Sequence, residues 1–192
     1  MSNTFSIENF KKALKFGGAR PNKFMITGLT PLFDDNSDQV LLVKAAQLPA
    51  SRITPIPVPF RGRQVQVAGD RIFDPWTVTV INDGNMEIRR KCEAWMSTIN
   101  AHAAGTAQSS EMSNYHNFDA TVHQLSLTGE TLYKYKFAQV WPSDISQIEL
   151  SYDAESQIEQ YDITFQVTYW TSAGTDGNNS GSDGFGDNTT FA

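Results

Sequence analysis

The side chains that could carry chemistry in this sequence are few and scattered. Three histidines, His102, His116 and His123, show no metal-ligand spacing and have no cysteine pair beside them. Cys92 is the one cysteine and falls on the apolar face of an expected helix, where a thiol packs rather than reacts. The sequence contains no GxSxG, HExxH, GxGxxG or phosphate-loop pattern. We therefore expect no catalytic, cofactor-binding or metal site, and we do not expect an enzyme.

A partial calcium-loop pattern lies near the C-terminus. Asp176, Asn178, Ser180, Gly181 and Asp187 would occupy positions one, three, five, six and twelve of such a loop. The twelfth position should hold a bidentate glutamate, and no flanking helix is evident. The pattern is therefore too incomplete to predict calcium binding.

A charged stretch, VAGDRIFDPWTVTVIND, spans residues 67–83. Gly69 and Asp70 predict a turn, and Asp74 before a proline fixes the start of the next strand. Arg71 can pair with a carboxylate of the same chain or of another chain. No second acidic cluster supports catalysis by these carboxylates. Two interpretations remain: an ion pair within a local turn, or contacts for assembly, which we favour.

Composition excludes several classes of function. The formal net charge is −6, whereas a dedicated nucleic-acid binder normally carries a basic excess. The single cysteine allows no intrachain disulfide and fits a reducing cytoplasm. The N-terminus lacks the features of a signal peptide, and no apolar run approaches the roughly 18 residues that span a bilayer. We expect a soluble protein with no membrane partner.

Alternating apolar and polar residues predict a mainly β fold. The clearest case is 162–170, in which Ile163, Phe165, Val167 and Tyr169 share one side. Such alternation predicts a sheet with one buried and one wet face. Prolines at alternate positions of 53–60 predict an edge strand or an extended arm. The expected strands are 23–29, 40–48, 53–60, 63–69, 75–81, 130–140, 147–152 and 162–170.

Two helices are expected beside the strands. Residues 4–16 predict a short amphipathic helix with Phe10 and Leu14 on one face, packed either on its own core or on a neighbouring subunit. Residues 85–104 predict a longer helix across a sheet, capped by the Asn82–Gly84 turn. Its apolar stripe comprises Ile88, Cys92, Trp95, Met96, Ile99 and Ala103.

The composition changes after Trp170. Residues 171–192 are rich in Gly, Ser, Asn and Asp and cannot bury enough surface to offset their ordering entropy. We therefore expect one folded domain over residues 1–170 and a flexible C-terminal tail over 171–192.

Several blocks of the sequence resemble the tail tube protein of contractile-tailed bacteriophages. The resemblance covers roughly residues 5–170 and is most specific over 56–83. The loop at 30–39 and the C-terminal tail are longer than the resemblance needs. The blocks are ARPNKF at 19–24, LPAS at 48–51, IPVPFRGRQVQVAGDRIFDPWTVTVIND at 56–83, WPSDISQIELSYD at 141–153 and EQYDITFQVTYW at 159–170.

The resemblance implies a fold and an assembly. The fold would be two packed antiparallel sheets, or a flattened β-barrel, with a helix on one flank and a projecting hairpin at about 52–73. Six copies would form a ring, and rings would stack into a tube, related to those of phage-tail-like bacteriocins and type VI secretion systems. We expect the tail to lie on the outer wall or to be disordered. The expected contacts between subunits or rings are Ile56, Val58, Phe60, Arg61, Arg63, Asp70, Arg71, Asp74, Phe10 and Leu14.

The resemblance also implies partners. The tube would bind the tail sheath, baseplate and tail terminator proteins, while the tape measure protein and DNA would pass through its lumen without specific binding. The subunit would assemble in the host cytoplasm and belong to the virion tail. Alternatives are an initiator or baseplate protein of the same fold, or the tube of a phage-tail-like injection system. A small β-barrel that binds a ligand or hydrolyses a glycan is a further alternative, without support from any motif.

Overall fold

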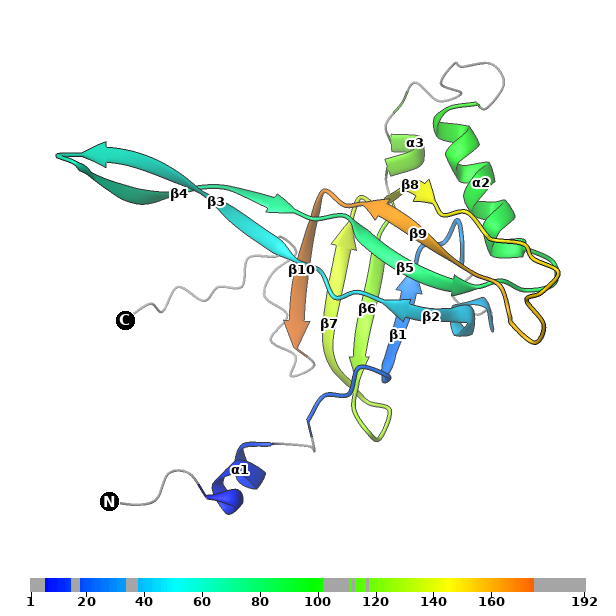
Figure 1. The fold of residues 1–192 in the computed structure, drawn as a ribbon, viewed down its shortest axis with the longest axis horizontal. Coiled ribbons are helices and arrows are strands. Elements are labelled where there is room, and N and C mark those ends of the chain that lie inside the picture. Colours follow the sequence, from blue (N-terminus) through cyan, green and yellow to red (C-terminus); the bar gives the residue numbers. More distant parts are fainter. Residues whose placement is uncertain are drawn as a thin grey trace.

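The computed structural model describes residues 6–14, 18–33, 38–101, 111, 113–116 and 118–174. Most of these residues form two four-stranded antiparallel sheets and a long two-stranded hairpin (Figure 1). The first sheet has the order β1-β6-β7-β10 and comprises Phe24–Gly28, Ala120–Leu125, Thr131–Ala138 and Tyr169–Gly174. The second sheet has the order β2-β5-β9-β8 and comprises Val43–Ala46, Trp76–Ile81, Gln160–Gln166 and Trp141–Ile145.

The two sheets pack on a shared apolar core. The Trp76 ring of β5 stacks on Phe137 of β7 at a centroid distance of 4.5 Å and lies 5.5 Å from Phe165 of β9. The Trp76 indole N–H donates to the Gln47 carbonyl at 2.9 Å, which satisfies its polar edge. The expectation of two packed antiparallel sheets is confirmed. Within the described residues the sheets do not close into a barrel, because β1, β10, β2 and β8 remain outer strands.

The side chains of β5 and β9 alternate between core and surface, as the sequence pattern predicts. Side chains of β5 alternate between buried and half-buried, and those of β9 follow the same period. On the polar side of these strands, the Thr79 hydroxyl donates to Asp162 at 2.6 Å, and Thr77 and Thr164 lie 3.4 Å apart. The second sheet therefore has one apolar and one hydrogen-bonded polar face.

Helix α2, Glu87–Ile99, covers one end of the second sheet (Figure 1). The Asp83 carboxylate accepts a hydrogen bond from the Glu87 amide at 3.0 Å, in agreement with the predicted cap. Ile88, Cys92 and Trp95 are buried, and Ile99 packs against the same cluster. Met96 is only half-buried and lies outside this cluster, and Ala103 lies outside the described residues.

The remaining helices are short. Helix α1, Ile7–Ala13, lies apart from the sheets, below them in Figure 1. Helix α3, Ser113–His116, lies next to α2, and the 3-10 helix η2, Asp38–Leu42, precedes β2. The predicted strand 40–48 is therefore a helical turn followed by a shorter strand.

Two further strand predictions are corrected by the structure. Residues 147–152 form part of a loop, because β8 already pairs with the free side of β9 and leaves no ladder for this segment within the described chain. Residues 162–170 divide between β9 and β10, which belong to different sheets, at Val167 and Thr168. Strand β10 continues through Gly174, beyond the expected start of the tail at residue 171. Residues 175–192 lie outside the described residues, so the flexible tail stays a prediction.

Candidate assembly surfaces

The hairpin of β3, Ser51–Phe60, and β4, Arg63–Phe73, projects far beyond the two sheets (Figure 1). Its two strands pair only with each other among the described residues. The connecting residues Arg61 and Gly62 both have positive φ, 44° and 81°, as a type I′ hairpin turn requires. The sequence therefore predicts this arm correctly, from its prolines and from the family resemblance.

The hairpin exposes an apolar face. Ile56 pairs with Val67, and Val58 pairs with Val65, so that these four side chains lie on one side of the ribbon. All four are exposed, as is Phe60 at the end of β3. The prolines lie on the opposite side, where Pro57 faces Gln66 and Pro59 faces Gln64. An apolar stripe of this length on a two-stranded arm is typical of a surface that another chain covers.

The charged residues at 69–74 are arranged differently from the predicted turn. Gly69, Asp70 and Arg71 lie within β4, and the hairpin turn is at residues 61–62. Gly69 is opposite the register shift between Ile53 and Pro55, where an added Cβ would lie 2.5 Å from the Thr54 carbonyl oxygen. This glycine therefore serves a close approach of two strands rather than a turn.

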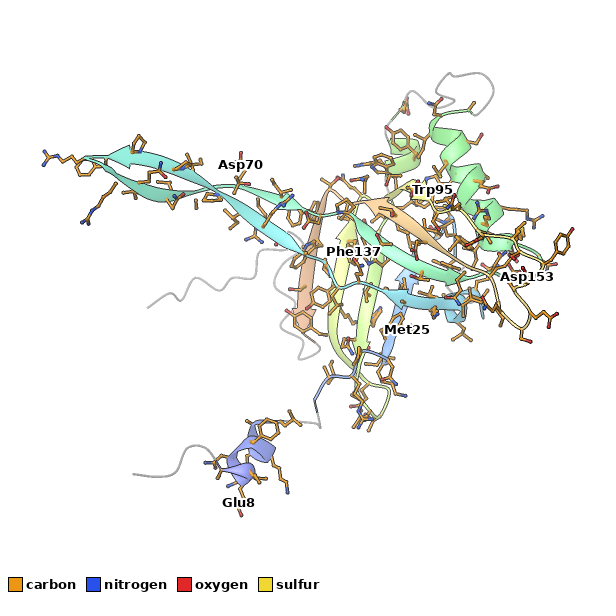
Figure 2. All side chains as sticks on the ribbon, viewed as in Figure 1. Glu8, Met25, Asp70, Trp95, Phe137 and Asp153 are labelled. Atoms are coloured by element: carbon orange, nitrogen blue, oxygen red, sulfur yellow. The ribbon has the colours of Figure 1, made fainter. Side chains whose placement is uncertain are left out.

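Of these charged residues, Asp74 has an ion-pair partner within the chain. It lies 3.6 Å from Arg52 across the base of the hairpin, with both side chains exposed. An exposed pair of this kind contributes little to stability. Asp70 points away from the arm (Figure 2), and it lies far from the core. The structure does not bring Asp70, Arg71 and Asp74 together into one cluster, and their role in assembly stays a prediction.

Helix α1 presents a second exposed apolar surface. Ile7, Phe10 and Leu14 share one side of the helix and are 75%, 66% and 46% exposed. The Ser6 hydroxyl accepts a hydrogen bond from the Asn9 amide at 3.2 Å and caps the helix. No residue of α1 is buried. The helix is thus not packed on the core of its own chain in this structure, and docking on another subunit stays a prediction.

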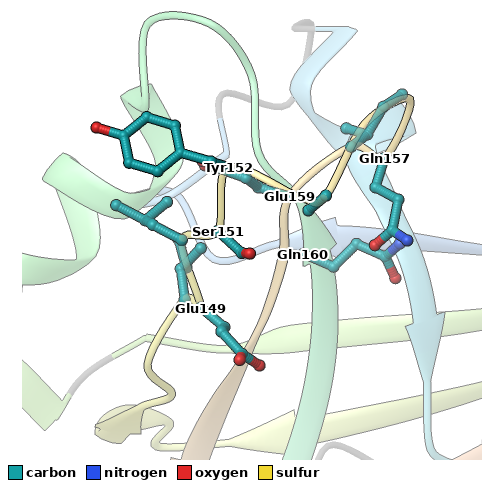
Figure 3. Close-up of a pocket in the computed structure, with 10 residues that line it drawn as sticks. Glu149, Ser151, Tyr152, Gln157, Glu159 and Gln160 are labelled. Atoms are coloured by element: carbon teal, nitrogen blue, oxygen red, sulfur yellow. The ribbon is translucent and has the colours of Figure 1, made fainter.

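A third surface is the loop between β8 and β9, residues 146–159. It encloses an open pocket of about 630 Å³ (Figure 3). Leu150, Tyr152 and Ile158 are strongly exposed on it, whereas Ile148 packs against the core. The sequence pattern does not predict this surface, because Leu150 and Tyr152 have the spacing of a strand. The available signal was the polar run from Asp153 to Gln157, which is typical of a loop.

His123, His116 and Cys92 lie in different environments in the structure. His123 Nε2 lies 2.8 Å from Thr27 Oγ1, and burial, with a smaller contribution from Lys134, lowers the pKa of this histidine. His116 Nε2 lies 3.3 Å from Thr168 Oγ1. Burial, with a smaller contribution from Glu93, raises the pKa of the Cys92 thiol to about 12, which keeps it protonated. His102 and the partial calcium loop lie outside the described residues.

In the ranges that the structure covers, no group of three or more His, Cys, Asp or Glu side chains is arranged to hold a metal ion. No described helix is both long and apolar enough to cross a membrane.

The described residues form two packed open sheets with a flanking helix and a projecting arm. The fold of this chain is similar to a chain of the six-fold symmetrised anti-feeding prophage baseplate, with a TM-score of 0.62 at 8% identity, covering 82% of this chain and 97% of the other. It is also similar to a chain of an extracellular contractile injection system sheath–tube complex, with a TM-score of 0.54 at 12% identity, covering 88% and 99%. At these identities the likeness shows the fold alone.

The sequence comparisons give the family. The family model described as phage tail tube protein matches residues 5–173. Tail tube protein gp19 of Enterobacteria phage T4 is 32% identical over 166 residues, which cover 85% of this chain and 98% of the relative. The tail tube protein of Serratia phage KSP90 is 25% identical over 162 residues, covering 81% and 90%. The chain belongs to the phage tail tube protein family.

Membership of this family confirms several predictions. The chain is a tail tube protein of the contractile-phage type, and is therefore a structural component of the virion tail rather than an enzyme. The family resemblance inferred from the sequence blocks is correct, including the block at 56–83 that forms most of the arm and β5.

Proposed function

We propose that this chain assembles into six-membered rings that stack into the inner tube of a contractile tail. The observation that carries the proposal is the β3–β4 arm, whose apolar face is exposed along most of its length. An arm of this kind is stable when a second subunit covers it, because burial removes apolar area from water. The outer strands β1, β10, β2 and β8 offer further edges for pairing between copies.

The assembled tube serves as a conduit for DNA during ejection. The chain carries a net charge of −6, and β5 and β9 of its second sheet share a polar face with Thr77, Thr79, Asp162 and Thr164. A channel lined by acidic, hydrated protein repels phosphates and does not retain DNA. DNA and a tape measure protein pass through this lumen without specific binding.

The outside and the two ends of the tube contact other tail proteins. Structures of similar fold come from a sheath–tube complex, a baseplate and a tube-terminating cap of contractile systems. We infer by analogy that this chain binds a sheath along the tube, a baseplate at one end and a terminator at the other. Assembly takes place in the host cytoplasm.

Electron microscopy of the purified full-length chain tests this function. We expect six-fold rings and stacked tubes at high protein concentration, with a baseplate-derived nucleus added if assembly does not start. Substituting Val58→Asp places a charge on the apolar face of the arm and should abolish stacking while the circular dichroism spectrum stays unchanged. The control is Gln66→Asp, which introduces a charge on the opposite side of the same arm. Tubes of normal length from Val58→Asp would contradict the role of this face.

The same images separate the tube from its initiator. Similarity to a baseplate chain at 8% identity concerns fold alone, whereas the T4 tail tube relative is 32% identical over nearly its whole length. A tube protein continues to add rings, while an initiator forms one ring and stops. Long tubes therefore support the tube assignment, and single rings in the presence of a nucleus would support the initiator.

A further inference from the structure

The exposed stripe of α1 has a cation at its border. Lys11 lies one turn from Ile7 and borders the stripe, whereas Lys12 lies on the opposite side of the helix. Both lysines belong to the last turn, where the helix dipole also favours positive charge. The helix thus presents a narrow apolar surface, Ile7, Phe10 and Leu14, with a positive border.

The β8–β9 loop carries the opposite charge to the border of α1. Residues 146–160 contain four acids, Glu149, Asp153, Glu155 and Glu159, and no lysine, arginine or histidine. Two cations contact the ends of this segment: Lys44 donates to Gln160 at 2.6 Å, and Arg89 donates to the Ser146 carbonyl at 3.3 Å.

The loop also has exposed apolar side chains beside an open pocket that could receive an apolar side chain. Leu150 and Ile158 are 78% and 68% exposed at the rim of the pocket, and Tyr152 is fully exposed. Figure 3 shows Glu149 on one arm of the loop and Gln157 and Gln160 on the other, with the open space between them. An apolar side chain inserted there would lie among apolar groups with acids around it.

We propose that this loop receives helix α1 of a second copy of the chain. The proposal rests on the proposed function, since it requires self-assembly, and it names a specific contact within that assembly. Apolar side chains of α1 cover Leu150, Tyr152 and Ile158, while Lys11 at the border of the stripe faces the acids of the loop. The helix of the same chain does not supply this contact, because Glu8 and Asp153 lie far apart in Figure 2.

Cross-linking between two variants that each carry one introduced cysteine tests the contact. Phe10→Cys protein is mixed with Leu150→Cys protein, assembled, and treated with a short bismaleimide; buried Cys92 is protected in the folded chain. The proposal expects cross-linked dimers from this mixture. The control mixture pairs Phe10→Cys with Leu127→Cys, an exposed leucine in the β6–β7 turn, and should give none.

The outcomes separate this contact from the proposed function. Tubes without a cross-link between positions 10 and 150 would overturn the contact and leave the tube function intact. A wild-type chain that stays monomeric with a nucleus present would overturn both. Cross-linked monomers from a Phe10→Cys/Leu150→Cys double variant, with no dimers from the mixture, would show that α1 folds back on its own loop.

Charge exchange gives an independent test that does not need the cysteine variants to assemble. Lys11→Glu should raise the protein concentration needed for assembly about tenfold, and adding Asp153→Lys or Glu155→Lys should restore it. The control adds Glu130→Lys, which makes the same change of net charge in the β6–β7 turn. Equal rescue by Glu130→Lys would show an effect of net charge alone and would overturn the contact.

Discussion

Cys92 and Gly69 occupy positions that depend on what packs against them. The apolar helical spacing predicts that Cys92 packs rather than reacts, and its position on the buried side of α2 agrees. Glycine beside aspartate predicts a turn at Gly69. A glycine can also serve a close approach between strands, and the sequence does not distinguish the two uses. The collision that an added Cβ would make with Thr54 is visible only when the two strands are paired.

Gly28, at the end of β1, provides a prediction at this scale. Its φ is +79°, and an added Cβ would lie 2.5 Å from the Asp119 carbonyl oxygen. Gly28→Ala should therefore lower the free energy of unfolding by about 2–4 kcal/mol, through backbone strain and a steric clash. Urea denaturation of the unassembled chain measures the change. Gly84→Ala is the control, since nothing lies within 4 Å of its added Cβ, and it should change stability by less than about 0.5 kcal/mol.

At the scale of elements, the alternation of apolar residues predicts that a segment is extended but does not predict which strands pair with it. The alternation over 162–170 is real, yet β9 lies in the interior of the second sheet and β10 at the edge of the first. The segment 147–152 has a similar alternation, but no described strand pairs with it. Pairing depends on residues far away in the chain, whereas periodicity reports only local spacing. The arm was predictable because three prolines restrict it to an edge.

Substitutions in α2 test which residues of the predicted apolar stripe belong to the core. Trp95 is buried with its ring 5.1 Å from that of Phe118, whereas Met96 is half-buried and lies outside the core cluster. Trp95→Ala should reduce stability by about 3–5 kcal/mol, because it leaves a large cavity. Met96→Ala should cost less than about 1 kcal/mol. Thermal unfolding of both variants measures the difference, and similar losses would mean that Met96 belongs to the core.

At the scale of the whole molecule, the exposed apolar surface is the feature that the sequence alone does not reveal. The pattern predicts which residues are apolar, and the structure shows that the arm, α1 and the β8–β9 loop leave many of them uncovered. These three surfaces lie at separate extremities of the chain (Figure 2). The assembly contacts predicted at the arm and at α1 lie on such surfaces, while the loop was missed because its spacing resembled a strand.

The net charge of the whole chain leads to a prediction about DNA. Assembled tubes should not retain duplex DNA at about 0.15 M salt, because like charges repel and no basic excess neutralises phosphates. Cosedimentation of tubes with labelled DNA measures retention. A histone-coated bead of similar size serves as the positive control. DNA that pellets with the tubes, and is released as salt rises, would contradict the proposed repelling lumen.

The division of one extended segment between the two sheets has a mechanical consequence. Strands β9 and β10 are joined at Val167 and Thr168, so a single run of backbone is hydrogen-bonded into both layers. Sliding one sheet past the other would require interstrand hydrogen bonds of both sheets to break at the same time. The two sheets of the subunit thus resist shear together, and in the proposed tube bending under load would fall instead on the arm, α1 and the β8–β9 loop.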